Sequence, residues 1–349
     1  MSPTGSAKRL FLLWMHSPRY PAWSVPRRSL GTIREALGQE WELRSLEVEL
    51  YAPGDGAASP PAELLQAIRR AEVYCGFGIQ REAFLAGQEL RWVHSGTAGV
   101  GASLFPEMRA SDVLFTNSAG VYAEPMAEHA IAMILHFARG LDVAAAGARE
   151  RVWRHPALAG RGSLVREVSG STLTVVGLGG TGRAVARRAA ALGMRVVAIR
   201  RNRGISPPGV EVTYGPEGLP KALSEAEFVV LTLPETPETE GLIGAPELAA
   251  MGPECVLINL SRGGVVEETA LIRALEEGRL RGAGLDVFRR EPLPQESPLW
   301  RLENVLITPH TSGVSPRFWE RETALIVRNI GHYLAGEPLE NRVDKELGY

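Results

Sequence analysis

Residues Thr172–Gly193 read TLTVVGLGGTGRAVARRAAALG. The β-branched, apolar start is typical of a buried strand, and the Ala- and Arg-rich second half is typical of a helix. Between them lies the pattern G-x-G-x-x-G, formed by Gly177, Gly179 and Gly182. With a strand before it and a helix after it, this pattern is typical of the phosphate-binding turn of dinucleotide-binding domains. We therefore predict that this part of the chain binds a dinucleotide.

Each glycine of the turn has its own physical role in that prediction. Gly177 permits the tight turn, Gly179 lets the backbone approach a pyrophosphate, and Gly182 lets the helix pack on the strand. The phosphates would lie against unpaired amides at the positive end of the helix, where Gly180 and Thr181 complete the predicted site. A plain turn between a strand and a helix is the alternative that the glycines by themselves leave open.

The size and composition of the chain exclude several classes of protein. At 349 residues it is too long for one ordinary core, so two domains are expected. A hydrophobic content of 45% and a charged content of 22% are typical of soluble globular proteins, and a net charge of −2 argues against nucleic acid or a membrane surface as partner. The apolar run Leu10–Met15 is too short for a signal peptide or a membrane span. Cys75 and Cys255 suit neither a disulfide framework nor a zinc site, which indicates a cytoplasmic protein.

Short apolar runs alternate with helical patterns in both halves of the chain, which predicts parallel sheets covered by helices. In the first half the expected strands are Leu10–Met15, Leu43–Val48, Glu72–Cys75, Trp92–His94 and Val113–Phe115. In the second half six strands are expected: Leu173–Val176, Arg195–Arg200, Phe228–Leu233, Val256–Leu260, Gly284–Phe288 and Val305–Thr308. Six such near-continuous apolar runs match the two mononucleotide-binding halves of a doubly wound domain.

Helical patterns occupy much of the chain between these strands. Four of the expected helices are Ser29–Leu37, Ala62–Arg70, Glu267–Glu277 and Arg317–Leu334. Pro125–Gly140 predicts a long amphipathic helix, and the helical pattern continues over Leu141–Arg154, so this segment would bridge two domains or pack against another subunit. His129 and His136 lie on one side of that helix, and we interpret both as packing or surface residues because no third metal ligand is near. No metal site is expected.

The second strand of the dinucleotide-binding unit favours NADP(H) over NAD(H). In NAD-dependent enzymes an acidic residue at the end of this strand binds the ribose hydroxyls. Here the strand ends in Arg200-Arg201-Asn202-Arg203, with no Asp or Glu. Guanidinium groups suit a 2′-phosphate, which they can bind through two hydrogen bonds at once. Solvated arginines in an arginine-rich protein are the alternative.

Three further stretches place ionisable residues just past the ends of buried strands, on the side where the glycine turn would hold a nicotinamide. They are Asn259–Gly264, Leu285–Pro294 and Ile307–Gly313. Together they suit the reduction of a 2-oxo acid: Arg262 would bind the carboxylate and stabilise charge on the carbonyl oxygen, and His310 would give or take the proton. A carboxylate such as Glu291 beside the imidazole would favour its charged form.

The order of these motifs resembles that of the D-isomer-specific 2-hydroxyacid dehydrogenase family, which includes glyoxylate/hydroxypyruvate reductases and phosphoglycerate dehydrogenases. The similarity covers about Val93 to Gly313. It consists of the segments TAGVG, MAEHAI, VVGLGGTG, LTLPETPET, INLSRGGVVEETAL, GAGLDVFRREPLP, SPLW and NVLITPHTSG.

The resemblance implies roles for individual residues. Arg262 would bind and polarise the substrate, His310 would be the acid/base, and Glu291 would be its partner. The backbone amides around Ala98 and Gly99 would bind the substrate carboxylate. The cofactor would also be lined by Leu233, Pro234, Thr239, Leu260, Ser261, Arg262, Asp286, His310, Ser312 and Gly313, with Asp286 near the nicotinamide.

The resemblance also implies an architecture of two Rossmann-like, doubly wound parallel-sheet domains separated by an active-site cleft. A discontinuous substrate domain would comprise residues 1–118 and 315–349, and the dinucleotide-binding domain residues 119–314. The long helix and the arm that ends near Trp153 would build a homodimer. Closure of the cleft about a hinge would expel water from the path of the hydride.

We therefore expect an NADP(H)-preferring reductase of a small 2-oxo acid, with glyoxylate or hydroxypyruvate as the leading substrate. Arg200 stands where NAD-dependent relatives carry Asp, and Glu291 stands in place of the Gln of the formate dehydrogenase branch. A phosphoglycerate dehydrogenase-like enzyme is an alternative, but a phosphorylated substrate would need cations, and the loop His94–Gly101 offers only His94. A non-catalytic dinucleotide-sensing corepressor is a second alternative, which would need the cofactor site without the acid/base pair.

Overall fold

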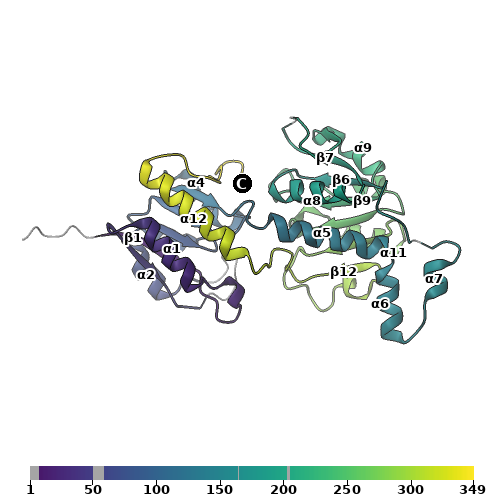
Figure 1. Ribbon diagram of the computed structural model, residues 1–349, viewed down its shortest axis with the longest axis horizontal. Helices are drawn as coiled ribbons and strands as arrows, with labels where there is room; N and C mark the ends of the chain where they lie inside the picture. The colour runs from purple at the N-terminus through teal and green to yellow at the C-terminus, as the bar shows by residue number, and fades with distance from the viewer. Residues whose placement is uncertain (1–7, 50–58, 164, 203–204) are drawn as a thin grey trace, which may run out of the picture. The chain divides into compact units, whose positions relative to one another are not determined.

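The computed structural model describes residues 8–49, 59–163, 165–202 and 205–349 (Figure 1). The chain divides into two compact units, one made of Met1–Tyr122 with Val314–Tyr349 and the other of Ala123–Gly313. The first crossing between them lies four residues later than the expected boundary at 118. The reason is that the short turn before Ala123 is bonded to the first unit, where Tyr122 donates a hydrogen bond to the Gly96 carbonyl and Arg321 to the Val121 carbonyl.

The first unit is built on a five-stranded parallel sheet in the order β2-β1-β3-β4-β5. The strands are β1 (Arg9–Trp14), β2 (Trp41–Ser45), β3 (Ala71–Gly76), β4 (Trp92–Ser95) and β5 (Leu114–Asn117). The helices are α1 (Arg27–Leu37), α2 (Ala62–Ile68), α3 (Arg81–Ala86), α4 (Pro106–Ala110) and α12 (Phe318–Ala335). All five expected strands are confirmed, although β2 ends at Ser45 and not at Val48. This is a doubly wound strand order, in which ligands bind at the carboxyl ends of the strands.

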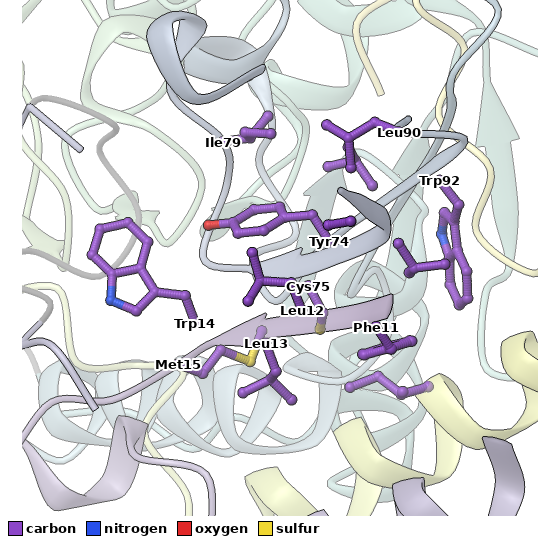
Figure 2. Packing of buried hydrophobic residues seen from close by; sticks show 14 of the residues in the cluster. Phe11, Leu12, Leu13, Trp14, Met15, Tyr74, Cys75, Ile79, Leu90 and Trp92 are labelled. Atoms are coloured by element: carbon purple, nitrogen blue, oxygen red, sulfur yellow. The ribbon is translucent and has the colours of Figure 1, made fainter. Parts of the chain in front are cut away.

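The core of the first unit forms around β1, which lies in the interior of the sheet. Phe11, Leu12 and Leu13 are all fully buried, so both faces of the strand are covered. Figure 2 shows these side chains on either side of β1, with Tyr74 of β3 and Trp92 of β4 among their neighbours. The Phe11 ring meets the Trp92 ring edge-on, with centroids 6.1 Å apart. Each such side chain contributes about 1.5–3 kcal/mol by leaving water.

The second unit is built on a seven-stranded parallel sheet in the order β12-β11-β10-β9-β6-β7-β8. The strands are β6 (Thr172–Val176), β7 (Arg195–Ile199), β8 (Val212–Tyr214), β9 (Phe228–Leu231), β10 (Val256–Asn259), β11 (Gly282–Leu285) and β12 (Val305–Ile307). The helices are α5 (Ala123–Ala138), α6 (Leu141–Glu150), α7 (His155–Ala159), α8 (Gly180–Ala191), α9 (Leu219–Ser224), α10 (Ala245–Ala250) and α11 (Glu268–Glu276). The order reverses between β6 and β9, which marks the switch point at which doubly wound sheets bind ligands.

Two expectations for the second unit were wrong. The sheet has a seventh strand, β8, which has only three half-buried residues and so carries too little apolar pattern to be recognised. The helical pattern of 125–154 is not one continuous helix either. It breaks at Gly140, which has a left-handed backbone with φ of 63°, and α6 leaves the break at 70° to α5. The strand expected at Gly284–Phe288 also begins earlier, at Gly282, and ends at Leu285.

Among the described residues, no single helix has the length and apolar composition needed to cross a membrane. Only the bent pair of α5 and α6 meets those two criteria when its helices are counted together.

Candidate active site

The glycine turn lies at the carboxyl end of β6, where the strand order reverses. Gly177 has a φ of 97°, a conformation that favours glycine, and a Cβ there would lie 2.8 Å from the backbone nitrogen of Leu233 in the loop after β9. A Cβ on Gly182 would lie 2.0 Å from the carbonyl oxygen of Gly177. Helix α8 can therefore approach β6 this closely only because both positions are glycine.

The start of α8 offers both donors and room to an anion. Gly179 caps the helix without a side-chain hydrogen bond, and Gly180 and Thr181 open its first turn. The amides of a first helical turn have no partner within the helix and carry its positive end. A Cβ placed on Gly179 would meet no atom within 4 Å, so there is open space beside these amides. Free donors and open space fit the pyrophosphate of a dinucleotide.

Two arginines follow β7 directly. Arg200 is half-buried, and its amide donates to the carbonyl of Tyr214 in β8 at 3.1 Å. Arg201 is exposed, and its guanidinium lies 3.9 Å from the carboxylate of Glu238. Arg203 lies outside the described residues. The two described guanidiniums stand at the end of the second strand of this unit, where doubly wound domains bind the ribose of a dinucleotide.

The loops after β9 and β10 carry five more predicted cofactor residues. Leu233, Pro234 and Thr239 follow β9, and Leu260 and Ser261 follow β10. The Thr239 hydroxyl donates to the Pro234 carbonyl at 2.7 Å, which holds the first of these loops in a tight turn. All five residues lie past the carboxyl ends of strands in the sheet that carries the glycine turn. Their contacts with a cofactor stay a prediction.

Arg262 is held by the end of β10. The amide group of Asn259 donates to the Arg262 carbonyl at 3.0 Å, and its oxygen accepts from the Ser261 amide at 3.0 Å. The half-buried guanidinium donates to the Ser261 carbonyl at 2.8 Å. A Cβ on Gly263 would lie 1.9 Å from the carbonyl carbon of Phe288, so the loop after β10 packs directly on the loop after β11.

Asp286 organises the loop that carries His310. It is fully buried just after β11, and its two carboxylate oxygens accept hydrogen bonds from that loop: from the Thr308 hydroxyl at 2.5 Å, the Thr311 amide at 2.9 Å and the Ser312 amide at 3.0 Å. The amide of His310 donates to the Asp286 carbonyl at 2.9 Å. The contacts printed for this carboxylate are thus with its own chain, and its predicted approach to a nicotinamide stays a prediction.

His310 and Glu291 form a close pair. The imidazole Nδ1 lies 2.7 Å from Glu291 Oε2, and Glu291 Oε1 accepts from the Phe288 amide at 2.9 Å. His310 has a φ of 53°, a left-handed conformation that costs a non-glycine residue about 1–3 kcal/mol. Its Nε2 has no hydrogen-bond partner among the described residues, and its side chain is 46% exposed. The pair therefore fixes Nδ1 and leaves Nε2 accessible to a ligand.

The charges of this site act on one another. The hydrogen bond to Glu291 raises the pKa of His310, and this outweighs the opposing effect of burial. Burial would raise the pKa of Glu291, but the hydrogen bonds from His310 and the Phe288 amide outweigh it, so that pKa lies below its usual value. The charge of Arg262 lowers the pKa of both groups, so all three lie within electrostatic range of one another. The structure thus brings together the three residues predicted to carry the chemistry.

In the first unit, the loop Ser95–Gly99 presents unpaired amides. Every carbonyl of this loop accepts a hydrogen bond within its own unit, and the donors are the hydroxyl of Ser118, the hydroxyl of Tyr122, the amide of Ser118, the side chain of Asn117 and the hydroxyl of Thr97. The amides of Ala98 and Gly99, by contrast, donate to no residue in the part of the chain that is described. Ala98 is exposed and Gly99 half-buried. Two adjacent free amides in a glycine-rich loop suit a carboxylate.

Several residues that hold the site were not singled out from the sequence. Asn259, Asn117 and Ser118 each end or follow a buried strand, a position where a polar side chain is a usable signal. His129 was interpreted as a packing or surface residue; it is half-buried, and its Nε2 lies 3.1 Å from the Thr308 hydroxyl. Within the described ranges, no group of three or more His, Cys, Asp or Glu side chains is placed to hold a metal ion.

Comparison with known proteins identifies the family. Residues 131–312 match the model of the D-isomer specific 2-hydroxyacid dehydrogenase, NAD binding domain. The chain is 38% identical to a glyoxylate reductase of Korarchaeum cryptofilum over 93% of this chain and 94% of that protein.

Two solved structures extend the similarity to both units. One is a D-isomer specific 2-hydroxyacid dehydrogenase from Xanthobacter autotrophicus in complex with NADPH, with 30% identity, a TM-score of 0.79 and coverage of 99% of this chain and 100% of that one. The other is an NADPH-dependent glyoxylate/hydroxypyruvate reductase from Sinorhizobium meliloti in complex with NADP and sulfate, with 26% identity, a TM-score of 0.77 and coverage of 98% and 100%. The chain therefore belongs to the D-isomer specific 2-hydroxyacid dehydrogenase family and is an oxidoreductase that uses a nicotinamide cofactor.

Proposed function

We propose that this protein is an NADP(H)-preferring reductase of small 2-oxo acids, with glyoxylate or hydroxypyruvate as the leading substrate. The observation that carries the proposal is the His310–Glu291 pair at 2.7 Å with Arg262 in electrostatic range of both, past the carboxyl ends of strands in the sheet that carries the glycine turn. The substrate class is supported by the glyoxylate reductases of Korarchaeum cryptofilum and Sinorhizobium meliloti.

The side chains of the site would divide the chemistry among them. A bound nicotinamide would supply the hydride. His310 would donate its Nε2 proton to the carbonyl oxygen of the substrate, and because Glu291 raises its pKa, more of the imidazole is protonated near neutral pH. Arg262 would bind the carboxylate through its planar fork and stabilise negative charge on the carbonyl oxygen. The free amides of Ala98 and Gly99 would also bind the substrate carboxylate.

The cofactor would be held mainly by backbone. The amides of Gly180 and Thr181 would bind the pyrophosphate beside the open space at Gly179. Arg200 and Arg201 would bind a 2′-phosphate, which only NADP(H) carries. The rest of the cofactor would be lined by Leu233, Pro234, Thr239, Leu260, Ser261, Asp286, Ser312 and Gly313.

One observation disfavours a phosphorylated substrate such as 3-phosphoglycerate. His94 is the only cationic candidate in the loop His94–Gly101, and it is fully buried. Its two ring nitrogens lie 2.8 Å from the Thr116 hydroxyl and 3.0 Å from the Glu322 carboxylate. It therefore has neither the exposure nor a free ring nitrogen with which to bind a phosphate.

A steady-state assay tests the proposal. We expect oxidation of NADPH with a higher kcat/KM than NADH, and a preference for glyoxylate or hydroxypyruvate over bulkier 2-oxo acids and 3-phosphohydroxypyruvate. The double variant R200S/R201S should lose roughly tenfold to a hundredfold in kcat/KM for NADPH, the equivalent of one charge-assisted contact, and nothing for NADH. The control R279S changes an exposed arginine of the same unit that is paired with Glu277. Equal use of both cofactors would contradict the NADP(H) preference, and no turnover of any acid would contradict the reductase.

We also propose that the protein forms a homodimer in a reducing compartment, the cytoplasm. The arm formed by α6 and α7 exposes apolar side chains, with Trp153 88% exposed and Val152 53% exposed (Figure 1). Burial of such side chains against a second copy would remove apolar surface from water. The thiols of Cys75 and Cys255 are free and buried, as suits a reducing compartment. Light scattering should give a dimer for the wild type and a monomer for W153E, and a monomeric wild type would contradict the proposal.

A further inference from the structure

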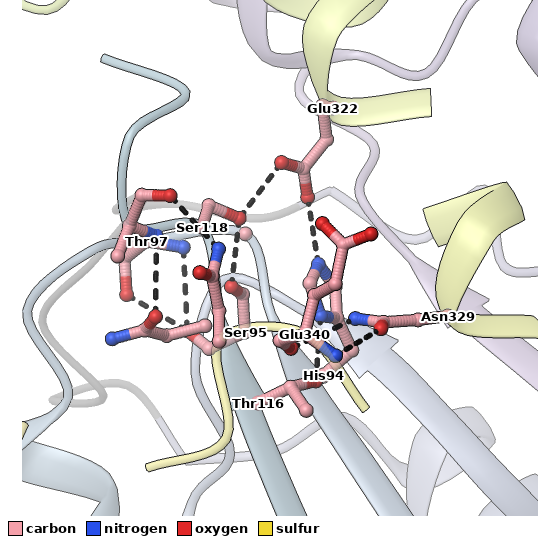
Figure 3. A network of polar contacts seen from close by, with 12 residues as sticks. His94, Ser95, Thr97, Thr116, Ser118, Glu322, Asn329 and Glu340 are labelled. Atoms are coloured by element: carbon pink, nitrogen blue, oxygen red, sulfur yellow. Dashed lines mark hydrogen bonds and ion pairs between the residues drawn. The ribbon is translucent and has the colours of Figure 1, made fainter. Parts of the chain in front are cut away.

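A continuous chain of buried polar groups connects helix α12 to the loop Ser95–Gly99 (Figure 3). Glu322 of α12 has a fully buried side chain, and its two carboxylate oxygens face different partners. Its Oε1 lies 3.0 Å from His94 Nε2, and its Oε2 lies 2.7 Å from the Ser118 hydroxyl. The Ser118 hydroxyl also lies 2.9 Å from the carbonyl of Ser95, where the loop begins.

The chain continues on the other side of the imidazole. His94 Nδ1 lies 2.8 Å from the hydroxyl of Thr116, which in turn accepts from the indole N–H of Trp92 at 2.8 Å. Because an indole nitrogen can only donate, the direction of this first hydrogen bond is fixed. The direction of each following hydrogen bond can then be worked out by counting protons.

If Glu322 carries a proton on Oε2, every contact of the chain contains one hydrogen. Trp92 donates to Thr116, the Thr116 hydroxyl donates to His94 Nδ1, and His94 Nε2 donates to Glu322 Oε1. Glu322 Oε2 then donates to the Ser118 hydroxyl, which donates to the Ser95 carbonyl. No donor or acceptor of this buried chain is left unpaired, which is the arrangement expected of buried polar groups.

If the carboxylate is ionised instead, one contact has no hydrogen. Ser118 has a single hydroxyl proton, and an ionised Glu322 would take it. The Ser118 hydroxyl oxygen and the Ser95 carbonyl oxygen would then face each other at 2.9 Å with no proton between them. A buried polar contact of this kind destabilises the conformation that creates it.

We propose that Glu322 is a positioning residue of the substrate loop, and that it acts as a hydrogen-bond donor in its protonated form. Through Ser118 it fixes the Ser95 carbonyl. The same residue, Ser118, binds the Thr97 carbonyl through its amide at 3.1 Å. With these carbonyls held, the amides of Ala98 and Gly99 keep their orientation toward the substrate carboxylate, so this inference rests on the proposed function of that loop.

Glutamine and alanine variants separate this role from a merely structural one. In E322Q the amide can still donate to Ser118 and accept from His94, so KM for the 2-oxo acid should stay close to the wild-type value. In E322A the tether is lost, and KM should rise roughly tenfold, as for one lost hydrogen bond, with kcat little changed. S118A breaks the same tether at the loop while leaving the His94–Glu322 contact, and should raise KM similarly if E322A fails to fold. E320A is the matched control, because Glu320 is an exposed glutamate of α12 paired with Arg317.

Two further measurements complete the test. The Kd for NADPH should be unchanged in all variants, since the cofactor site belongs to the other unit. The difference infrared spectrum of wild type against E322Q should show the carbonyl stretch of a protonated carboxylic acid. Loss of substrate affinity in E322Q equal to that in E322A, an unchanged KM in both E322A and S118A, or absence of the infrared band would overturn the inference. An inactive wild type that shows the band would instead overturn the proposed reductase and leave the proton on Glu322.

Discussion

Glu291→Gln tests how the site controls its proton. The carboxylate accepts from two donors in different directions, with Oε2 2.7 Å from His310 Nδ1 and Oε1 2.9 Å from the Phe288 amide. A glutamine has one oxygen and one NH2 group, so it can accept at only one of these positions and places a donor against a donor at the other. The variant therefore keeps the shape of the side chain and loses both its charge and one hydrogen bond.

The size of the effect follows from the exposure of the pair. A hydrogen bond between charged groups stabilises by about 1.5–3 kcal/mol when it is shielded from water. The side chain of His310 is 46% exposed and that of Glu291 29%, so solvent screens the pair and we take the lower end. A loss of about 1.5 kcal/mol corresponds to a roughly tenfold fall in kcat/KM for the reduction near neutral pH.

The pH dependence carries the sign of the effect. Reduction needs a protonated His310, so the rate should fall as pH rises through the pKa of that group. Glu291 raises this pKa, and its removal should move the falling limb of the rate profile to lower pH. Oxidation of the hydroxy acid needs the neutral imidazole, and its rising limb should move in the same direction.

The assay is a pair of pH–rate profiles, one for each direction, measured for wild type, E291Q and the control E296Q. Glu296 is an exposed glutamate of the same loop, and its replacement should leave both limbs in place. If E291Q lowers the rate equally at every pH while both limbs stay fixed, Glu291 does not set the protonation of His310. If E291Q has wild-type activity throughout, the pair has no part in the reaction.

Three other changes have expected outcomes of different kinds. Arg262→Lys keeps the charge but loses the planar fork, and kcat/KM should fall by a factor of about a hundred in the same steady-state assay; near wild-type turnover would refute the role of Arg262. Gly179→Ala should leave the melting temperature unchanged, because its Cβ meets no protein atom, but should weaken NADPH binding at least tenfold in a fluorescence titration; the matched control Gly252→Ala, also in open space, should do neither. Tyr74→Phe removes a buried hydroxyl that has no hydrogen-bond partner among the described residues, so urea unfolding should show a free energy higher by about 1 kcal/mol, and a lower value would show that the hydroxyl is bonded.

The features that could be predicted from the sequence are those whose physical cause is local. The turn at Gly177–Gly182 is specified by the strand and helix that flank it, and the structure has a strand and a helix at these positions. Ten of the eleven expected strands begin within two residues of their predicted starts, and β11 begins two residues early, because each buried parallel strand is a continuous apolar run. The short edge strand β8 has no such run. The break at Gly140 was also missed, since a single glycine inside a helical pattern does not show whether its backbone will turn left-handed.

The features that could not be predicted depend on contacts between distant parts of the chain. His94 and Glu322 are 228 residues apart, and nothing near either one indicates the other. The position of Arg262 beside Glu291 could be anticipated because both follow neighbouring parallel strands. That Gly263 would lie against the Phe288 peptide, and so fix the distance between their two loops, required the packed structure.

Asp286 and His310 show why a family pattern does not by itself assign a mechanism to each of its residues. His310 lies in a left-handed conformation that an isolated histidine would leave, because it costs about 1–3 kcal/mol. The hydrogen bonds that Asp286 accepts from Thr308, Thr311 and Ser312 surround His310 on both sides in the sequence, and they offset that cost. The buried carboxylate therefore acts on the proposed reaction through the backbone of the acid/base. A charge that the sequence placed beside the nicotinamide is, in the folded chain, first of all what keeps the imidazole in position against Glu291.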